Sequence, residues 1–249
     1  MALHGILFDM GGTLLHYNAP DATWEQTEKT GVRGIYHRLQ ETGYTLPPET
    51  DALDAAWDHA LALWSDLDAH DVTDLKLHVQ VRLIVKRWGV HDVSPDLLDA
   101  LGNAYMAAIQ AHVTPLEGVH ETLQSLRERG LRVGLISNTH WPGVHHQHDL
   151  DRFGLTSYLE HMVFSGDVEA WKPHGEIFQL GLDALDLTPD TAAYVGDSLY
   201  FDVWGAQRAG LRSVWIEQQH PWLPEGITAT PDAAIKRLPD LLGIVEAWQ

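Results

Sequence analysis

Short apolar runs alternate with amphipathic stretches in the first and last parts of the chain. The apolar runs with the length of buried strands are 3–8, 131–136, 162–164, 192–195 and 213–216. Helical periodicity covers 117–129, where Gly130 follows as a stop signal, and 174–185. Buried strands that alternate with helices predict an α/β fold, a Rossmann-like, doubly wound parallel sheet covered on both faces.

Residues 17–113 have a different pattern, without a convincing strand. Apolar residues recur at helical spacing between Leu53 and Leu67, and Ser94-Pro95 is typical of a helix cap and first turn. We therefore expect an α/β core domain made of residues 1–16 and 114–249. Residues 17–113 are expected to form an inserted α-helical cap domain.

The charge balance limits the partners of the chain. Its 249 residues contain 35 Asp+Glu against 16 Lys+Arg, a formal net charge of −19. Such a surface repels nucleic-acid backbones and anionic membranes, so we expect neither as a partner. An anionic substrate then needs local positive charge, from a metal ion or a placed lysine. The absence of cysteine excludes disulfides, thiolate zinc sites and Cys nucleophiles.

No apolar run reaches the length of a membrane span, and the N-terminal run is too short for a signal peptide. We therefore expect a cytoplasmic protein.

Polar residues close four of the predicted strands, and ligands of a parallel sheet bind beyond its carboxyl ends. The first strand runs into Asp9-Met10-Gly11-Gly12-Thr13, a carboxylate followed by two glycines and a hydroxyl. Phosphoryl oxygens can approach backbone amides beside glycine, which has no side chain. Carboxylates attack phosphorus, although a strand-to-loop turn with a capping Asp has the same composition.

Three elements that are weaker by themselves close the later strands. Ser137 and Asn138 offer a hydroxyl and a backbone amide to phosphate oxygens, but they are also ordinary loop residues. Lys172, which precedes a proline, can supply positive charge, although most lysines are merely solvated. Asp197 and Asp202 straddle a strand end and a helix start, and they suit a hard cation that prefers oxygen ligands.

In this order and combination, the four elements resemble the motifs of the haloacid dehalogenase superfamily, the aspartate-nucleophile phosphatases and their relatives. The continuation Asp-Val-Trp-Gly-Ala-Gln-Arg-Ala-Gly at 202–210 also matches, so the resemblance covers the whole chain. The helical insert resembles the cap of the first class of that superfamily. The resemblance implies a Mg²⁺-dependent phosphatase that cleaves a small phosphorylated metabolite through an aspartyl-phosphate intermediate.

The resemblance also implies roles for the matched residues. Asp9 would be the nucleophile, Ser137 would bind the transferring phosphoryl group, and Lys172 would neutralise charge on it. Further phosphate contacts would come from Gly12, Thr13 and Asn138. The metal ligands would be Asp9, the main-chain carbonyl of Gly11, Asp197 and, directly or through water, Asp202. Mg²⁺ and Lys172 would offset the repulsion between a carboxylate and a phosphate dianion.

Gly11 departs from the pattern of the family's phosphatases. Those enzymes have a second Asp there, which protonates the leaving alcohol and then activates water. General acid–base help is worth roughly 10²–10⁴-fold. We therefore rank first a phosphatase that acts on good leaving groups, or that uses another donor such as His16, Tyr17 or a cap residue.

Other functions remain open alternatives. A carbon–phosphorus hydrolase of the same superfamily has a small residue at this position and uses a cap lysine, for which Lys29, Lys76 and Lys86 are available. An L-2-haloacid dehalogenase needs no metal and usually lacks the Gly196-Asp197 pair. A catalytically weak protein that binds phosphorylated ligands is an alternative of another class. The sequence leaves the physiological substrate and the oligomeric state open.

The histidines of the run His145-His146-Gln147-His148, with His140 upstream, invite interpretation as a metal site. Adjacent histidines on a helix point in different directions, so they rarely share an ion. We therefore favour a solvated helical segment.

Overall fold

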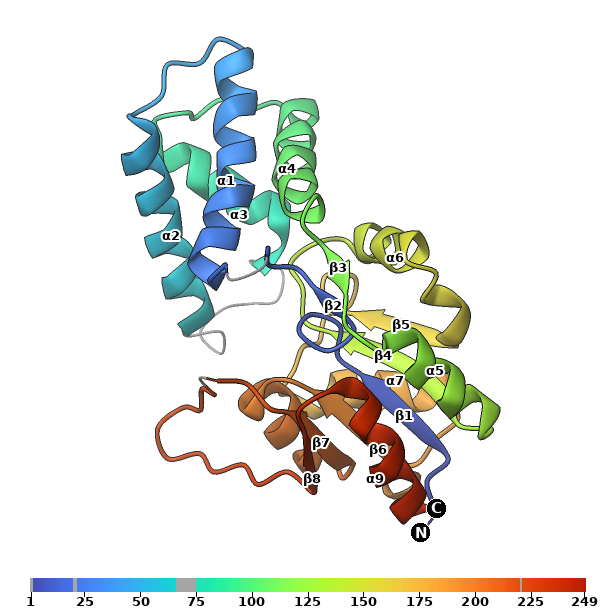
Figure 1. Cartoon of the computed structure of the whole chain (residues 1–249). Coiled ribbons are helices and arrows are strands. Elements are labelled where there is room, and N and C mark those ends of the chain that lie inside the picture. The colour runs from blue at the N-terminus through green and yellow to red at the C-terminus, as the bar shows by residue number, and fades with distance from the viewer. Residues whose placement is uncertain (1, 20–21, 66–74, 220) are drawn as a thin grey trace. The chain divides into compact units, whose positions relative to one another are not determined.

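The chain folds into two compact units. The computed structural model describes residues 2–19, 22–65, 75–219 and 221–249 (Figure 1). The core unit is Met1–His16 with Thr114–Gln249, and the helical unit is Tyr17–Val113. Among the described residues, no helix combines the length and the apolar character that crossing a membrane requires.

A six-stranded sheet forms the centre of the core unit, in the order β5-β4-β1-β6-β7-β8. All of its neighbouring strands pair in parallel, which confirms the predicted α/β fold. The strands are β1 (Gly5–Phe8), β4 (Arg132–Ser137), β5 (His161–Phe164), β6 (Ala192–Gly196), β7 (Arg212–Ile216) and β8 (Ala233–Ile235). The sequence pattern did not predict β8, because three residues are too few to show a period.

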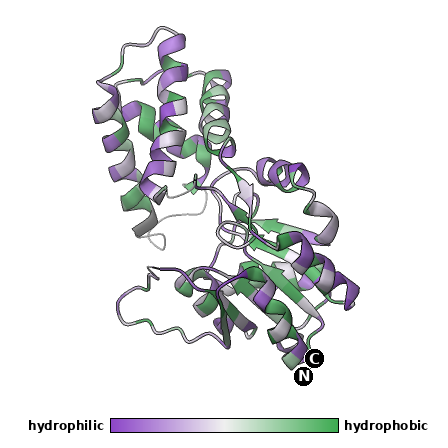
Figure 2. Ribbon diagram, in the orientation of Figure 1, coloured by the Kyte–Doolittle hydropathy of each residue, from purple (hydrophilic) through white to green (hydrophobic). Residues whose placement is uncertain are grey.

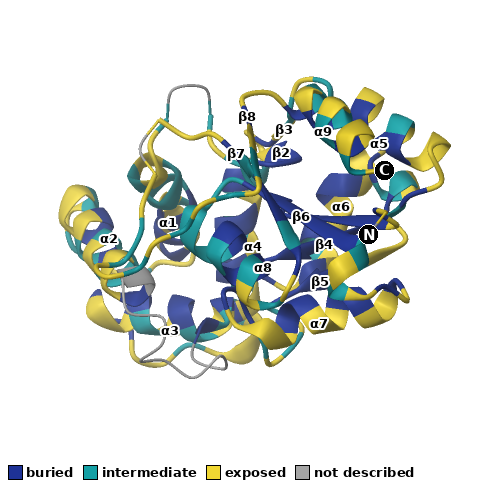
Figure 3. Cartoon of the chain, turned by 90° about the horizontal axis from the view of Figure 1, so that it is seen from below, coloured by how far each residue is buried: buried dark blue, intermediate teal, exposed yellow. Residues whose placement is uncertain are grey.

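Helices cover both faces of this sheet. In Figure 3, α5 (Val119–Glu128) and α9 (Leu241–Trp248) lie on one face and α7 (Gly175–Ala184) on the other. The remaining helices of the unit are α6 (Gly143–Arg152) and α8 (Gly205–Arg208). Every residue of β1 and β6 is buried, and the central strands are correspondingly hydrophobic in Figure 2. Burial on both faces explains why these strands have continuous apolar runs.

The position of β1 determines where a ligand can bind. β4 and β5 lie on one side of β1, and β6, β7 and β8 on the other. Phe8 pairs with both Leu135 and Val195, and the N–H of Asp9 donates to the Val195 carbonyl at 2.8 Å. The polar residues that follow β4 and β6 are therefore brought beside Asp9, where the strand order reverses.

A second, two-stranded sheet joins the points where the chain leaves and re-enters the core unit. It pairs β2 (Leu15–His16) with β3 (Thr114–Pro115) in antiparallel orientation. The sequence pattern did not predict this pair. Two-residue strands exist only through their partner, so they have no pattern of their own.

The helical unit contains α1 (Trp24–Glu41), α2 (Glu49–Ser65), α3 (Leu77–Arg87) and α4 (Pro95–Gln110). The predicted cap of the last helix is confirmed, since the Ser94 hydroxyl accepts from the Leu97 N–H at 3.2 Å. In α2, Leu53 is buried, whereas Leu61 is 46% exposed. Leu67, at the end of the predicted apolar repeat, lies outside the described residues.

Two glycines in α1 allow α4 to pack closely against it. A Cβ atom at Gly34 would collide with the backbone carbonyl of Ala104, and one at Gly31 with the ring of Tyr105. Glycine inside a helix costs about 1 kcal/mol relative to alanine. Close contact between the two helices compensates for that cost.

We predict that Gly34→Ala lowers the free energy of unfolding by about 1–3 kcal/mol, because a backbone carbonyl cannot move aside for the added methyl group. Gly102→Ala in α4 is the matched control, since a Cβ there comes no closer than 3.6 Å to Leu77. That substitution should stabilise by up to about 1 kcal/mol through helix propensity. Urea unfolding of both variants is the measurement. Equal effects of the two substitutions would contradict the proposed close contact.

Candidate active site

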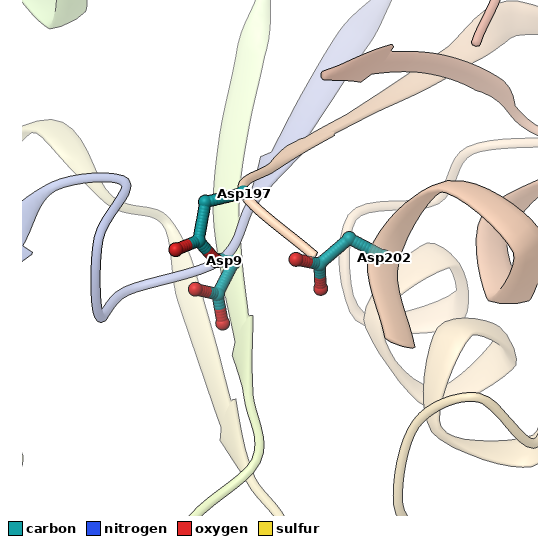
Figure 4. Close-up of side chains that lie close together, drawn as sticks. All are labelled: Asp9, Asp197 and Asp202. Carbon is teal, nitrogen blue, oxygen red and sulfur yellow. The ribbon is translucent and has the colours of Figure 1, made fainter. Parts of the chain in front are cut away.

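Three carboxylates converge beyond the ends of β1 and β6. The side chains of Asp9, Asp197 and Asp202 point toward one another in Figure 4, and one oxygen from each lies within 4.8 Å of the others. Asp9 follows β1 and Asp197 follows β6. Asp202 lies in the π-helical turn Leu199–Trp204. The structure therefore brings these predicted site residues together.

A buried lysine completes the cluster. The ammonium of Lys172 donates to Asp9 Oδ1 and to Asp202 Oδ1, each at 2.7 Å, and to the Tyr194 hydroxyl at 2.9 Å. Lys172 is only 2% exposed. All three N–H directions of the ammonium are thus used within the protein. The ammonium is bound to the carboxylate of Asp9, and its expected role in neutralising charge on a phosphoryl group stays a prediction.

Two glycines leave room for the carboxylates of the cluster to lie against the backbone. Gly12 has a φ of +75°, and a Cβ atom there would collide with the carboxylate of Asp197. A Cβ at Gly196 would collide with the carboxyl group of Asp202. Asp202 is in turn held by the N–H of Ser198, which donates to its Oδ2 at 2.8 Å. Backbone and carboxylates therefore pack without intervening side chains.

The electrostatics of the cluster follow from burial. Burial raises the pKa of Asp9 to about 6; the Asp202 carboxylate adds to the rise, and Lys172 opposes it. Burial and the neighbouring Asp9 and Asp202 raise the pKa of Asp197 well above its ordinary value. Burial by itself lowers the pKa of Lys172, but Asp202 and Asp9 outweigh this and raise it well above the usual range. The lysine is therefore a permanent cation.

The donor set fits a divalent cation. With all three carboxylates ionised, the state that a bound cation would favour, one ammonium leaves two negative charges uncompensated in a buried site (three minus one). A divalent ion with a preference for oxygen would balance that charge. Asp9, Asp197 and Asp202 would hold such an ion, and Gly11 has a carbonyl that the backbone bonds of its loop leave unused.

The loop after Asp9 uses two of its predicted phosphate contacts internally. The N–H of Gly12 donates to the Leu15 carbonyl at 2.8 Å, and that of Thr13 to the Met10 carbonyl at 3.3 Å. The Thr13 hydroxyl is buried without a hydrogen-bond partner. These bonds shape the loop, and a direct phosphate contact from Gly12 or Thr13 stays a prediction.

The side chain of Asn138 holds the backbone of Lys172, and a phosphate contact from the backbone amide of Asn138 stays a prediction. Its side-chain Oδ1 accepts from the Lys172 N–H at 2.8 Å, and its Nδ2 donates to the Lys172 carbonyl at 2.9 Å. The amide side chain therefore clamps the backbone of the lysine instead of pointing at a phosphate. Ser137 ends β4 and is 2% exposed; its phosphate role stays a prediction.

The sequence argument assigned no role to Tyr194 or Trp215. Tyr194 binds the lysine ammonium, and the indole N–H of Trp215 donates to the main-chain carbonyl of Asp197 at 2.9 Å. A signal for the tyrosine was present in the strand Ala-Ala-Tyr-Val-Gly. A phenol in a fully buried apolar strand needs a polar partner.

The expected solvated histidine segment is wrong for His146. It is 4% exposed, and its Nε2 lies 2.6 Å from the hydroxyl of Thr139. Its ring stacks on the rings of Trp141 and Phe164, with distances between ring centroids of 4.8 and 5.7 Å, respectively. His148 is exposed, as expected, because α6 buries only one face. His16, at the end of β2, is exposed as well.

Comparison with known proteins agrees with this geometry. The family model described as haloacid dehalogenase-like hydrolase matches residues 65–216, more than half of the chain. The chain therefore belongs to the haloacid dehalogenase-like hydrolases and is a hydrolase of that family. Membership implies a divalent metal ion at the site.

Curated relatives resemble the chain in sequence, and a solved structure resembles it in fold. The chain is 29% identical to a glyceraldehyde 3-phosphate phosphatase of Methanopyrus kandleri, over 70% of this chain and 81% of the relative. It is 30% identical to the pyrimidine 5'-nucleotidase YjjG of Escherichia coli, over 68% and 72%. The magnesium-bound HAD-hydrolase YfnB of Bacillus subtilis has the same fold, with a TM-score of 0.69, 18% identity and coverage of 98% and 99%.

We predict that His146 makes folding sensitive to acid. Burial, with His140 and His145 nearby, lowers its pKa to about 3, against about 6.5 in an unfolded chain. Above about pH 6.5 the ring is neutral in both states and adds no pH dependence. As the pH falls toward 3, only the unfolded chain takes up the proton, so stability is lost at up to about 1.4 kcal/mol per pH unit.

His146→Phe keeps the stacking ring and should reduce this slope between pH 6 and 4, measured by urea unfolding. His148→Gln on the same helix is the matched control and should leave the slope unchanged, because that side chain is exposed. An unaltered slope in His146→Phe would show that the ring is protonated equally in both states.

Proposed function

We propose that the protein is a magnesium-dependent phosphatase of small phosphorylated metabolites, in which Asp9 attacks phosphorus. The observation that carries the proposal is the meeting of the Asp9 carboxylate with Asp197, Asp202 and the Lys172 ammonium at one strand edge. Among the relatives, the named phosphatases support the class of substrate. The magnesium-bound YfnB supports the identity of the ion.

The residues suggest the following chemistry. Lys172 holds Asp9 through Oδ1, so the other carboxylate oxygen is the one that attacks. A bond forms between that oxygen and phosphorus, and the bond to the leaving oxygen breaks with its electron pair. Water then attacks the phosphorus of the aspartyl phosphate, and the bond from phosphorus to the Asp9 oxygen breaks with its electron pair. This step regenerates the carboxylate, and both protons of the water leave with the phosphate, as dihydrogen phosphate. A bound Mg²⁺ would offset the repulsion between the carboxylates and the phosphate.

Gly11 narrows the substrates that react well. It cannot protonate a leaving alkoxide, so we propose that the favoured substrates carry aryl or acyl leaving groups, which depart without a proton. The helical unit, as the proposed cap, would supply the rest of the specificity. In this proposal, a metal ion and one lysine supply the positive charge that lets an acidic chain bind an anionic substrate.

The alternatives have less support. Lys29, a candidate for the Schiff-base lysine of a phosphonate hydrolase, is bound by Glu25 at 2.7 Å and by Asp54 at 2.5 Å. The hydrogen bonds that the ammonium donates to Asp54 and Glu25 raise its pKa, which disfavours the neutral amine that such chemistry needs. A dehalogenase that needs no metal has no use for the three-carboxylate cluster, and a simple binder has no need of a nucleophile.

We predict that the protein releases phosphate from p-nitrophenyl phosphate only with Mg²⁺, and that EDTA abolishes the release. Asp9→Asn should lower kcat by about a thousandfold or more, because the nucleophile is lost. Glu49→Gln, which removes a half-buried carboxylate of the helical unit outside the cluster, is the matched control. Chloride release from 2-chloropropionate without metal would instead select the dehalogenase. Phosphate binding without turnover would select the binder.

We also predict that aryl and acyl phosphates are cleaved roughly 10²–10⁴-fold faster than matched alkyl phosphates, the range that a general acid supplies. Steady-state kinetics on phenyl and ethyl phosphate are the measurement. Equal rates would mean that another group donates the proton.

Gly11→Asp should raise the turnover of alkyl phosphates and so reduce the difference in rate between aryl and alkyl phosphates. Gly11 is not among the glycines with positive φ, so an aspartate can adopt its backbone conformation. No gain in a folded, magnesium-binding variant would contradict the role assigned to this position.

A further inference from the structure

Lys172 is held by two residues outside the proposed nucleophile and metal ligands. Two of its three ammonium partners, Asp9 and Asp202, belong to that machinery. The third partner is the Tyr194 hydroxyl, and the backbone of the lysine is bound by Asn138. Neither residue is needed to complete the metal site or to attack phosphorus.

The Tyr194 hydroxyl has a fixed position. It accepts from the lysine ammonium at 2.9 Å and donates to the Ile136 carbonyl in β4 at 2.7 Å. The tyrosine is 1% exposed, and its ring packs edge-on against Phe178 at 5.1 Å. A hydroxyl that donates to a strand carbonyl has its lone pairs left for the lysine, so it is oriented as an acceptor.

Asn138 fixes the other end of the lysine. Its side chain makes one bond to the Lys172 N–H and one to the Lys172 carbonyl, at 2.8 and 2.9 Å. Two bonds to one residue restrict both its position and its orientation, as a single bond would not. The loop that carries the lysine is therefore held to the end of β4.

A lysine needs such support more than most residues. Its ammonium is carried on four flexible carbons and has no preferred plane. Productive geometry at a reacting centre has to be kept within a fraction of an ångström. Asp9 and Asp202 attract the ammonium by charge, but this attraction has little directionality. The third acceptor closes the remaining N–H direction.

We propose that Tyr194 and Asn138 are positioning residues, which hold Lys172 from its side-chain and main-chain ends so that its ammonium bridges Asp9 and Asp202. The inference rests on the proposed function of Asp9 as nucleophile. The Tyr194 hydroxyl and the Asn138 side chain make their hydrogen bonds within the protein, so they act through Lys172. Their loss should lower kcat and leave KM nearly unchanged.

Tyr194→Phe keeps the buried ring and removes only the hydroxyl. We expect kcat for p-nitrophenyl phosphate to fall about tenfold, with KM within about twofold of the wild type. Tyr36→Phe is the matched control, because the Tyr36 hydroxyl likewise donates to a backbone carbonyl, that of Pro47, at 2.8 Å. It should leave kcat unchanged. Both variants are assayed well below their melting temperatures, so that a stability loss alone does not alter kcat.

Asn138→Ala tests the hold on the main chain of Lys172. The double variant tests whether Tyr194 and Asn138 both act through that lysine. If both residues act through Lys172, the loss of kcat in Tyr194→Phe/Asn138→Ala should be smaller than the product of the single losses. Independent losses that multiply would overturn the shared role. An unchanged kcat in Tyr194→Phe, with only a lowered melting temperature, would overturn its positioning role.

A crystal structure of Tyr194→Phe gives a readout that does not depend on turnover. We expect the Lys172 ammonium to leave hydrogen-bonding reach of Asp9 or to occupy several positions. An unmoved lysine would overturn the inference even if the wild type hydrolysed no phosphate ester. The activity of Asp9→Asn tests the proposed function, and the position of Lys172 in Tyr194→Phe tests the positioning role. The two measurements are independent, so failure of the one is distinguishable from failure of the other.

Discussion

The site depends on one buried ion cluster, the Lys172 ammonium between Asp9 and Asp202. Charges removed from water are unfavourable unless they are paired and hydrogen-bonded. Here the ammonium satisfies all three of its donors, and Asp202 gains the Ser198 N–H as well. The negative charge that remains on the cluster makes it complementary to a divalent cation. Burial is the main reason why the pKa values of Asp9 and Asp197 are raised in the free protein, and the neighbouring carboxylates add to the rise.

The cluster imposes requirements on the backbone around it. The parallel register brings Asp9 beside the end of β6, and only glycine at positions 12 and 196 leaves room for the carboxylates of Asp197 and Asp202. Similar contacts recur in the helical unit, where glycines in α1 allow α4 to approach. Glycine therefore marks places where backbone has to lie against a functional group or another helix.

Gly11 has a different consequence, because it lacks a chemical group instead of making room for one. Asp9, the proposed nucleophile, lies with Lys172 and the carboxylates of Asp197 and Asp202 in one cluster, as the proposed attack on phosphorus requires. At this position the chain lacks both the acid that would protonate a leaving alcohol and the base that would activate water. The proposed preference for aryl and acyl phosphates follows from this difference. The preference concerns the breaking of the bond from phosphorus to the leaving group, and not the formation of the bond from Asp9 to phosphorus.

The sequence by itself determined the parallel α/β sheet, the helical stretch after the first strand, and the identity of the charged residues that meet. Continuous apolar runs and the motifs at strand ends are local signals. The apolar runs are strong signals because the strands are buried on both faces. The tertiary structure decided which partner each side chain has. Asn138 binds the backbone of Lys172, Tyr194 binds its ammonium, and His146 is stacked in the core. These contacts join residues up to 34 positions apart, and their geometry follows from register and packing, which no local pattern records.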